Sequence, residues 1–375
     1  QFYFEGNEMI AGFALMCHQK HIEVGCRLDL TLTDEGFKVL EINNGSSIGG
    51  WQIHSFEPLI RQLHSPLADP ETANDFESKN TQVIYIQFLV DKILQHVASI
   101  KDEINIFIDL SAFEEQQFLR NANAFFNDLL QRELKSRGLK GQAFAGSAGS
   151  LKAGSTGDIL LGDKTMHAIL MFKAGDAARK ASSMLLRPFM MGKIYWPDHV
   201  GMLMMKNKAN LAMLRELAER GVFTADENEL VLNHVPWTSI VKNREIIFRG
   251  NSYNLLQLLR GNKDQFVIKD ANGAQGKDVF VGKFITPQEW EDAIRLALET
   301  KSFIVQEFSD SLDFLAPDSS NGSGDWVPHK LIWGAFGYGE RYGGVWVRLS
   351  TQKTSNGVIN SATGAVEAIV YEARG

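Results

Sequence analysis

The sequence predicts a mixed fold of the α/β (α+β) class, in which an α/β layer is inserted between β-hairpin segments. "INIFIDL" (104–110), an amphipathic helical pattern over 111–137 and "GQAFAGSAGSL" (141–151) form a strand–helix–strand unit. "CRLDLTLTDEGFKVLEINNGSSIGG" (26–50) has the pattern of a β-hairpin with a polar turn. "QFVIKDANGAQGKDVFVGKF" (265–284) has the pattern of a second strand–turn–strand segment, around glycines.

Before the strand–helix–strand unit, a helix precedes the first hairpin. A polar loop is expected at 66–80, followed by a helix over "TQVIYIQFLVDKILQHV" (81–97). Gly138 ends the long helix that starts near Ser111, since glycine is favoured just past a helix C-terminus. "HAILMFKA" (167–174) is predicted as a further strand of the α/β layer.

In the second half of the chain, "MMKNKANLAMLRELAERG" (204–221) is predicted as a loop that leads into a helix. Thr286 and Glu289 form a capping box with Pro287 at the first helical position, so a helix begins there. "SFIVQEF" (302–308) is predicted as a strand, and 329–350 as β structure around Gly343 and Gly344.

Composition excludes several classes of function. The chain has 375 residues, 44% hydrophobic and 22% charged, which is typical of a globular protein of two or three domains. A net charge of −7 without a block of Lys or Arg argues against a nucleic-acid partner. No apolar run reaches the roughly 18 residues that a membrane span needs. Two cysteines and no visible signal peptide favour the cytoplasm, and the apolar start "QFYFEGNEMIAGFAL" is typical of a chain that lacks native N-terminal residues.

Four polar residues of the first hairpin are spaced for a common site. Residues two apart in a strand point to one face, so Arg27 and Asp29 share a face, as do Glu41 and Asn43. Folding the hairpin brings two carboxylates and one amide oxygen together with a guanidinium beside them. Mg²⁺ prefers oxygen ligands and usually takes one or two carboxylates plus nucleotide phosphates. The set therefore predicts a magnesium–nucleotide site in preference to ordinary surface ion pairs.

"RLDLTLTDEGFKVLEINNGSS" resembles the metal-binding hairpin of the ATP-grasp ligases, which reads R-x-D, a glycine-containing turn and E-x-N. In most ATP-grasp proteins this hairpin follows the nucleotide-binding lysines, whereas here it comes first. That order resembles the circularly permuted ATP-grasp group, which includes glutathionylspermidine synthase. The resemblance implies an ATP-grasp core with Asp29, Glu41 and Asn43 as ligands of two Mg²⁺ ions, and Arg27 as the catalytic arginine that stabilises the transition state.

A lysine and a glycine loop follow the hairpin in the chain. Lys269 ends a strand just before Gly273 and Gly276, where backbone amides and a positive charge can approach phosphates together. The segment resembles the glycine hairpin of the family, except that Asp270 stands where proline is common. Lys208 in "KNKANLAML" resembles the second nucleotide lysine, and it is preferred over Lys206 because it forms the Asn-Lys pair of that element.

The resemblance also implies contacts at the two ends of the site. Gln306 and Glu307 lie where the family leads into a hinge, so they are expected to bind adenine or the ribose hydroxyls. Ser46 and Ser47 follow the last metal ligand and are expected to hold a substrate carboxylate, with a plain Gly/Ser turn as the alternative. Arg348 occupies a position where the family carries an arginine that binds substrate or phosphate, with a structural ion pair as the alternative.

The expected organisation follows from these elements. Residues 1–55 form the metal-binding part of the ATP-grasp core, 56–180 an α/β substrate-domain insert, 181–260 a linking part with the nucleotide lysine, 261–310 the small ATP-binding lobe, and 311–375 the return to the core.

The resemblance implies an ATP-dependent ligase that joins a small carboxylate, such as an amino acid or peptide, to an amine in peptide or natural-product biosynthesis. Two alternatives use the same site: an ATP-dependent phosphotransferase, and a nucleotide-binding protein without turnover. His54, His329 and Asp29 are all available as a base, and the sequence singles out none of them. It also leaves open whether the protein forms a homodimer.

Overall fold

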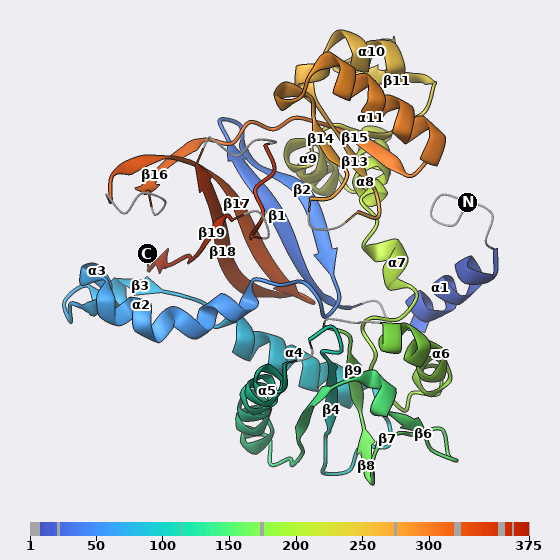
Figure 1. The fold of residues 1–375 in the computed structure, drawn as a ribbon, viewed down its shortest axis with the longest axis vertical. Coiled ribbons are helices and arrows are strands. Elements are labelled where there is room, and N and C mark those ends of the chain that lie inside the picture. Colours follow the sequence, from blue (N-terminus) through green and yellow to red (C-terminus); the bar gives the residue numbers. More distant parts are fainter. Residues whose placement is uncertain are drawn as a thin grey trace.

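Figure 1 shows the computed structural model, which describes residues 8–20, 23–113, 115–172, 176–273, 276–318, 324–351, 357–361 and 364–374. A large antiparallel sheet forms the middle of the molecule. Its strand order is β19 (Val366–Ile369), β18 (Arg341–Thr351), β17 (Trp326–Tyr338), β1 (Gly25–Thr33) and β2 (Gly36–Asn44), and β16 (Asp313–Pro317) also pairs with β17. The first hairpin of the chain therefore lies beside its last strands, which brings Arg348 and the predicted metal ligands into one sheet.

Below this sheet in Figure 1 lies a parallel layer. Strand β4 (Ile106–Asp109) pairs in parallel with β5 (Ala143–Gly146) on one side and β9 (Ala168–Leu170) on the other. Helix α5 (Gln116–Ser136) connects β4 to β5, and Gly138 follows it with a φ of 70°. The predicted strand–helix–strand unit is therefore confirmed, although the strand after it is shorter than 141–151.

Helix α4 (Thr81–His96) confirms the helix predicted over 81–97, and it joins the parallel layer to the central sheet. Its apolar face, including Leu89 and Ile93, belongs to one core cluster with Ile106 of β4 and with Phe336 and Tyr338 of β17. These side chains are almost fully buried. The parallel layer is thus packed firmly against the sheet that carries the predicted site.

The upper lobe in Figure 1 has a core of its own. Its antiparallel sheet has the order β10 (Thr238–Ile240), β15 (Phe303–Glu307), β13 (Phe266–Asp270) and β14 (Val279–Val281). Helices α10 (Leu255–Gly261) and α11 (Pro287–Thr300) pack on this sheet, and α11 begins at the predicted capping box of Thr286 and Glu289. The hairpin β11 (Glu245–Phe248)–β12 (Asn251–Asn254) completes the lobe.

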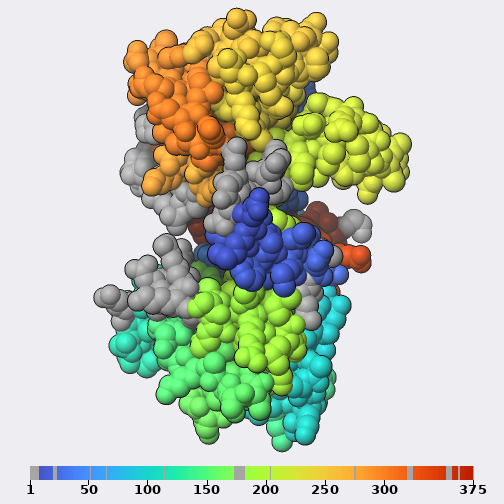
Figure 2. Space-filling view, turned by 90° about the vertical axis from the view of Figure 1, so that its right-hand side faces the viewer, coloured from blue at the N-terminus to red at the C-terminus, as the bar shows by residue number. Residues whose placement is uncertain are grey.

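Shorter elements connect these three parts. Helices α7 (Met202–Met205), α8 (Ala209–Glu219) and α9 (Ala225–His234) lead from the lower layer to the upper lobe. In Figure 2, α1 (Glu8–Lys20, blue) lies across the middle of the visible face, between the green lower layer and the yellow and orange lobe. Among the described helices, none is both long and apolar enough to cross a membrane.

The remaining elements include those of a third core cluster, which contains Ile159, Met166 and Leu185. They are the helices α2 (Glu57–Leu63), α3 (Ser65–Ala68) and α6 (Asp176–Met190), the strands β3 (Phe76–Glu77), β6 (Lys152–Ala153), β7 (Ile159–Leu161), β8 (Lys164–Met166) and β20 (Glu372–Ala373), and the 3₁₀ turns at Trp51–Phe56, Ala73–Asp75, Ala148–Ser150, Lys263–Gln265 and Gly282–Phe284. The loop expected at 66–80 thus contains short ordered elements.

Candidate nucleotide and metal site

A cavity of about 820 Å³ separates the central sheet from the upper lobe. It is lined by residues of β1, β2, β17 and β18 on one side and of β13, β14 and β15 on the other. The predicted site residues that line it are Arg27, Asp29, Glu41, Asn43, Ser47, Lys208, Lys269, Gly273, Gly276, Gln306, Glu307 and Arg348. Ser46 is the predicted site residue that does not line the cavity.

The hairpin sets its four polar residues in two opposed pairs. Arg27 lies directly across from Asn43, and Asp29 directly across from Glu41. Beyond Asp29 the register shifts, because Leu30 pairs with Val39 and leaves Leu40 as an extra residue in β2. Such a bulge twists a strand and redirects neighbouring groups. It turns the Leu40 carbonyl toward the upper lobe, where Lys269 binds it.

Two arginines hold Asp29. Arg27 donates to it from Nε at 2.7 Å and from Nη2 at 3.1 Å, and Arg348 donates from Nη2 at 2.7 Å. Burial would raise the pKa of Asp29, but the guanidinium groups of Arg27 and Arg348 outweigh it and keep the pKa below its ordinary value. Asp29 is therefore an anion in the folded protein.

Trp346 forms the floor beneath both arginines. Each guanidinium carbon lies 5.4 Å from the centre of the indole ring, within the range of a cation–π contact. Gly50 and Gly334 let the ring approach, since a Cβ on Gly50 would lie 2.2 Å from it and a Cβ on Gly334 2.0 Å from it. Glycine at 50 is thus explained by packing against this floor as well as by its φ of 87°.

Arg27 also fixes the loop that follows the hairpin. Its Nη1 donates to the carbonyl oxygens of Ile48 and, at 2.9 Å, Gly49. Most of its donors are therefore used within the protein. Arg348 is less engaged, because its buried Nε has no partner among the described residues. Arg348 is consequently the arginine with donor capacity left for a ligand.

Lys208 joins the hairpin to the glycine loop. It is 6% exposed, its Nζ lies 3.2 Å from Glu41 Oε1, and it donates to the carbonyl of Gly273. The preceding Asn207 accepts from the Ala209 amide at 2.9 Å and donates to Asn272 at 3.0 Å, so the Asn-Lys pair holds the start of α8 against the loop. Lys206 is exposed and does not line the cavity.

Lys269 occupies the opposite wall. It donates to Gln306 Oε1 at 2.7 Å and to the Leu40 carbonyl at 3.1 Å. Burial lowers the pKa of Lys269 to about 8, with the charge of Glu41 acting against this shift and that of Lys208 adding to it. Gln306 is itself only 1% exposed and donates to Thr238 Oγ1 at 3.2 Å. Its amide therefore positions Lys269.

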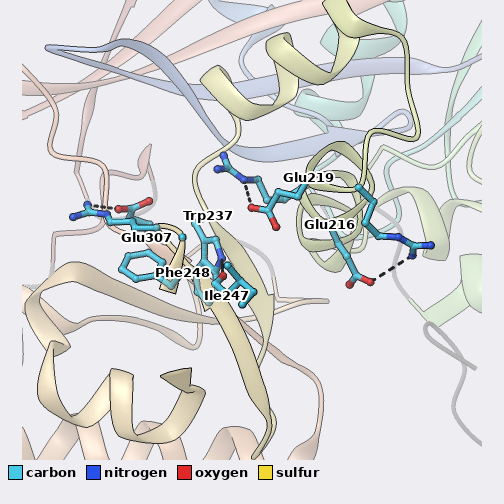
Figure 3. A pocket seen from close by; sticks show the side chains of 10 residues that line it. Glu216, Glu219, Trp237, Ile247, Phe248 and Glu307 are labelled. Atoms are coloured by element: carbon cyan, nitrogen blue, oxygen red, sulfur yellow. Dashed lines mark hydrogen bonds and ion pairs between the residues drawn. The ribbon is translucent and has the colours of Figure 1, made fainter. Parts of the chain in front are cut away.

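Glu307 lies between two cavities. It lines the large one and also a second cavity of about 490 Å³ beside α8, shown in Figure 3. There it accepts from Arg249 at 2.5 Å. The other charges at this second cavity are paired as well, Arg215 with Glu219 at 2.9 Å and Arg220 with Glu216 at 3.9 Å. The second cavity thus offers little unpaired charge to a ligand.

The glycine loop packs against the segment 357–361. Gly276 has a φ of 74°, and a Cβ there would lie 2.7 Å from Val358 Cγ1. Gly273 places its carbonyl on Lys208. Both glycines line the cavity, as does the segment 357–361.

The two serines after the hairpin have different surroundings. Ser47 is exposed toward the cavity, whereas Ser46 is 2% exposed and donates from Oγ to Asp198 at 2.6 Å. Asp198 also accepts from the Ser46 amide at 2.9 Å and from the Met171 amide at 2.8 Å. Ser46 thus ties the end of the hairpin to the parallel layer.

Several buried polar atoms at the cavity lack a partner. These are Thr31 Oγ1, Asn43 Nδ2, Trp346 Nε1 and Arg348 Nε, each judged within the part of the chain that the structure describes. Unpaired buried polar atoms are uncommon, so a group of them at one cavity indicates a polar ligand. Thr31 follows Arg27 and Asp29 at the same spacing of two residues along β1, so all three point to one face. This period of two is the signal by which Thr31 could have been predicted as a site residue from the sequence.

The oxygen set fits a magnesium ion. The described residues contain no group of three His, Cys, Asp or Glu side chains that could bind a metal unaided. Asp29, Glu41 and Asn43 instead provide two carboxylates and an amide. Mg²⁺ commonly binds only one or two protein carboxylates when phosphates and water supply its other ligands.

The fold recurs in solved proteins. A glutathione synthetase-like effector of Globodera pallida, solved in its apo form, superposes with a TM-score of 0.56 at 10% identity, covering 98% of this chain and 84% of that one. A protein of Methylobacillus flagellatus KT with the provisional name gamma-glutamylcysteine synthetase matches with a TM-score of 0.49 at 12% identity, covering 98% and 85%. No protein-family model and no curated protein matches the sequence. The chain thus shares the fold of the glutathione synthetase-like effector.

Proposed function

We propose that the protein is an ATP-dependent carboxylate–amine ligase of the circularly permuted ATP-grasp type, which forms an amide bond through an acyl phosphate and releases ADP and phosphate. One observation carries this proposal. The hairpin oxygens, two buried lysines and the glycine loop come from three distant parts of the chain and line the same cavity. A surface hairpin with ordinary ion pairs would not need the buried Lys208 and Lys269 opposite it.

The chain order supports the permuted arrangement. The hairpin β1–β2 precedes both lysines in sequence, yet it lies in one sheet with β17 and β18, which follow them. The resemblance to the permuted group rests on that order. The partition into 1–55, 56–180, 181–260, 261–310 and 311–375 belongs to the same proposal, with the α/β layer as the substrate domain.

The residues of the cavity suit the binding of a triphosphate. Lys208 and Lys269 would offset the phosphate charge from two walls, and Gly273 and Gly276 line the same cavity, where the lack of side chains lets a phosphate approach the backbone. Asp29, Glu41 and Asn43 would hold Mg²⁺, which neutralises phosphate charge and aligns the transferred group when it is bound. Arg27 adds a fixed positive charge beside that group.

The reaction itself needs little proton chemistry from the protein. An oxygen of the substrate carboxylate attacks the γ-phosphorus of ATP, the bond from that phosphorus to the bridging oxygen breaks, and ADP leaves. The amine nitrogen then attacks the acyl carbon, phosphate leaves with the electron pair of the C–O bond, and the nitrogen releases its extra proton to phosphate or water. Arg348 is the group with donor capacity for the carboxylate, and Ser47 lies at the same cavity.

A phosphate-release screen tests the function. The protein is incubated with ATP, Mg²⁺ and pairs drawn from a set of amino acids, peptides and amines. A ligase releases phosphate and ADP when a carboxylate and an amine are both present. Phosphate transfer to a single substrate without an amine would indicate the phosphotransferase, and nucleotide binding without turnover across the set would indicate the inactive protein.

A further inference from the structure

Thr31 is a buried polar side chain that the proposed chemistry leaves unused. The residue is among those that line the large cavity, and it is 1% exposed. Its hydroxyl has no hydrogen-bond partner among the described residues. Burying a hydroxyl without a partner destabilises a protein, whereas valine has nearly the same shape without that cost. A threonine at this position is therefore explained best by a ligand that completes its hydrogen bond.

The position of Thr31 along β1 indicates which part of a bound nucleotide would lie next to it. It lies on the same face of β1 as Asp29, two residues further on, which corresponds to about 7 Å along a strand. The bulge at Leu40, where Lys269 binds the carbonyl oxygen, lies between these two positions. Asp29 marks the metal and phosphate end of the cavity. Thr31 is therefore about 7 Å further from the phosphates, which is the distance at which the ribose of a nucleotide would lie.

From Asp29 to Thr31, strand β1 runs toward the segment that follows β15. Leu312 donates its amide to the carbonyl of Leu32 at 2.8 Å, so this end of β1 lies against residues 308–312. Ser309 and Ser311 of that segment line the cavity too. In the nucleotide site proposed above, Thr31 therefore lies at the nucleoside end, where the hairpin meets residues 308–312.

The chemistry of the hydroxyl selects its partner. A threonine hydroxyl donates one hydrogen bond and accepts others, and a ribose hydroxyl does the same, so the two form a matched pair. Phosphate oxygens only accept hydrogen bonds, and the function proposed above assigns them to Lys208 and Lys269, which line the same cavity. We propose that the Thr31 hydroxyl binds a ribose hydroxyl of the nucleotide, and that this contact makes the protein prefer ribonucleotides to deoxyribonucleotides. The proposal rests on the nucleotide site proposed above.

A cycle of protein and ligand changes tests this contact. Dissociation constants of ATP, 2′-deoxyATP and 3′-deoxyATP are measured by calorimetry with Mg²⁺ and without a second substrate, on wild type, Thr31→Val and Thr31→Ser. In wild type, removing the contacted ribose hydroxyl weakens binding roughly 3- to 10-fold. In Thr31→Val the same deoxynucleotide binds as well as ATP does. Thr31→Ser retains the preference, because it retains the hydroxyl.

Thr33→Val is the matched control on the same strand. The Thr33 hydroxyl donates to the Gly36 carbonyl at 2.9 Å in the hairpin turn, so its loss lowers the melting temperature but leaves the ribose preference intact. Thr31→Val, in contrast, melts at the wild-type temperature or above it without nucleotide, since it removes an unpaired hydroxyl.

The outcomes separate the two proposals. A wild-type protein that binds ATP and both deoxynucleotides equally, or a Thr31→Val variant that keeps the wild-type preference, overturns the role of Thr31 and leaves the nucleotide site standing. A wild-type protein that binds none of the three overturns the nucleotide site and the Thr31 contact with it.

Discussion

Arg348 donates to the Asp29 oxygen that already accepts from Arg27, and it does so at 2.7 Å from β18, which β17 separates from β1 in the same sheet. Both carboxylate oxygens of Asp29 are thus occupied by guanidinium groups. A carboxylate has about four lone-pair sites, so these three bonds leave one site, on Oδ1, for a metal ion. Arg348 makes one bond to Asp29 and has an unpaired Nε, while Arg27 makes two bonds and also holds the loop at Ile48 and Gly49. Arg348 is therefore the less firmly held of the two arginines.

Arg348→Met is therefore expected to strengthen metal binding in the absence of nucleotide. A like charge a few ångströms from a divalent ion costs on the order of a few kcal/mol at an effective dielectric constant of about 20, so the affinity should rise at least tenfold. Free Mn²⁺, used in place of Mg²⁺, is measured by electron paramagnetic resonance. Arg341→Met is the control, because Arg341 pairs with Asp91 away from the cavity. An equal gain in both variants would mean that net charge alone is responsible.

Glu41→Gln is expected to abolish turnover while the fold persists. Glu41 makes one ion pair, with Lys208, and its side chain is 30% exposed, so losing its charge should change the melting temperature by a few degrees at most. The loss of a metal-binding carboxylate should lower phosphate release at least a hundredfold. Activity near the wild-type level would show that Glu41 is not a ligand of the metal ion.

Asp29→Asn should differ from Glu41→Gln in stability. It leaves the buried guanidinium groups of Arg27 and Arg348 without an anion, and breaking a buried pair from one side costs about 3–5 kcal/mol. Urea denaturation measures the difference. If Asp29→Asn unfolds at the wild-type midpoint, the two arginines do not depend on Asp29 in solution.

The charge of Lys269 gives nucleotide binding a pH dependence. Its pKa is lowered to about 8 by burial, and bound phosphate would raise that pKa again. Below pH 8 the lysine is protonated before and after binding, so affinity is constant. Above pH 8 binding must take up a proton, so affinity falls by up to tenfold per pH unit. Calorimetry of ATP and Mg²⁺ from pH 7 to 9.5 should show this decline in wild type, and Lys269→Met should bind weakly at every pH.

The local arrangement of the site was predictable because it depends on strand periodicity. The period of two placed Arg27 with Asp29 and Glu41 with Asn43, and the polar turn set them opposite each other. The pairing of Asp29 with Arg348 was not predictable in this way, because it depends on β1 and β18 both pairing with β17. Sequence periodicity carries no information about which distant strands become neighbours.

The reason for a glycine at a given position is not evident from the sequence. The β structure expected around Gly343 and Gly344 is confirmed, because both lie inside β18, and the chain turns before them, at Gly339 with a φ of 61°. A Cβ on Gly343 would lie 2.6 Å from the Tyr338 ring, and one on Gly344 2.9 Å from Lys79 Cβ. These two glycines make room for neighbouring side chains, a role that sequence alone does not distinguish from a turn.

Ser46 and Ser47 are expected to differ although they are adjacent in sequence. Ser46→Ala removes a buried donor to Asp198 and should lower the free energy of unfolding by about 1–3 kcal/mol, with no change in ATP affinity. Ser47→Ala changes an exposed residue at the cavity, so it should leave stability unchanged and weaken the carboxylate substrate once that substrate is identified. Urea denaturation and substrate titrations distinguish the two roles. A Ser46→Ala variant of wild-type stability whose KM for the carboxylate rises would return Ser46 to the substrate site, and would mean that the bond to Asp198 opens when substrate binds.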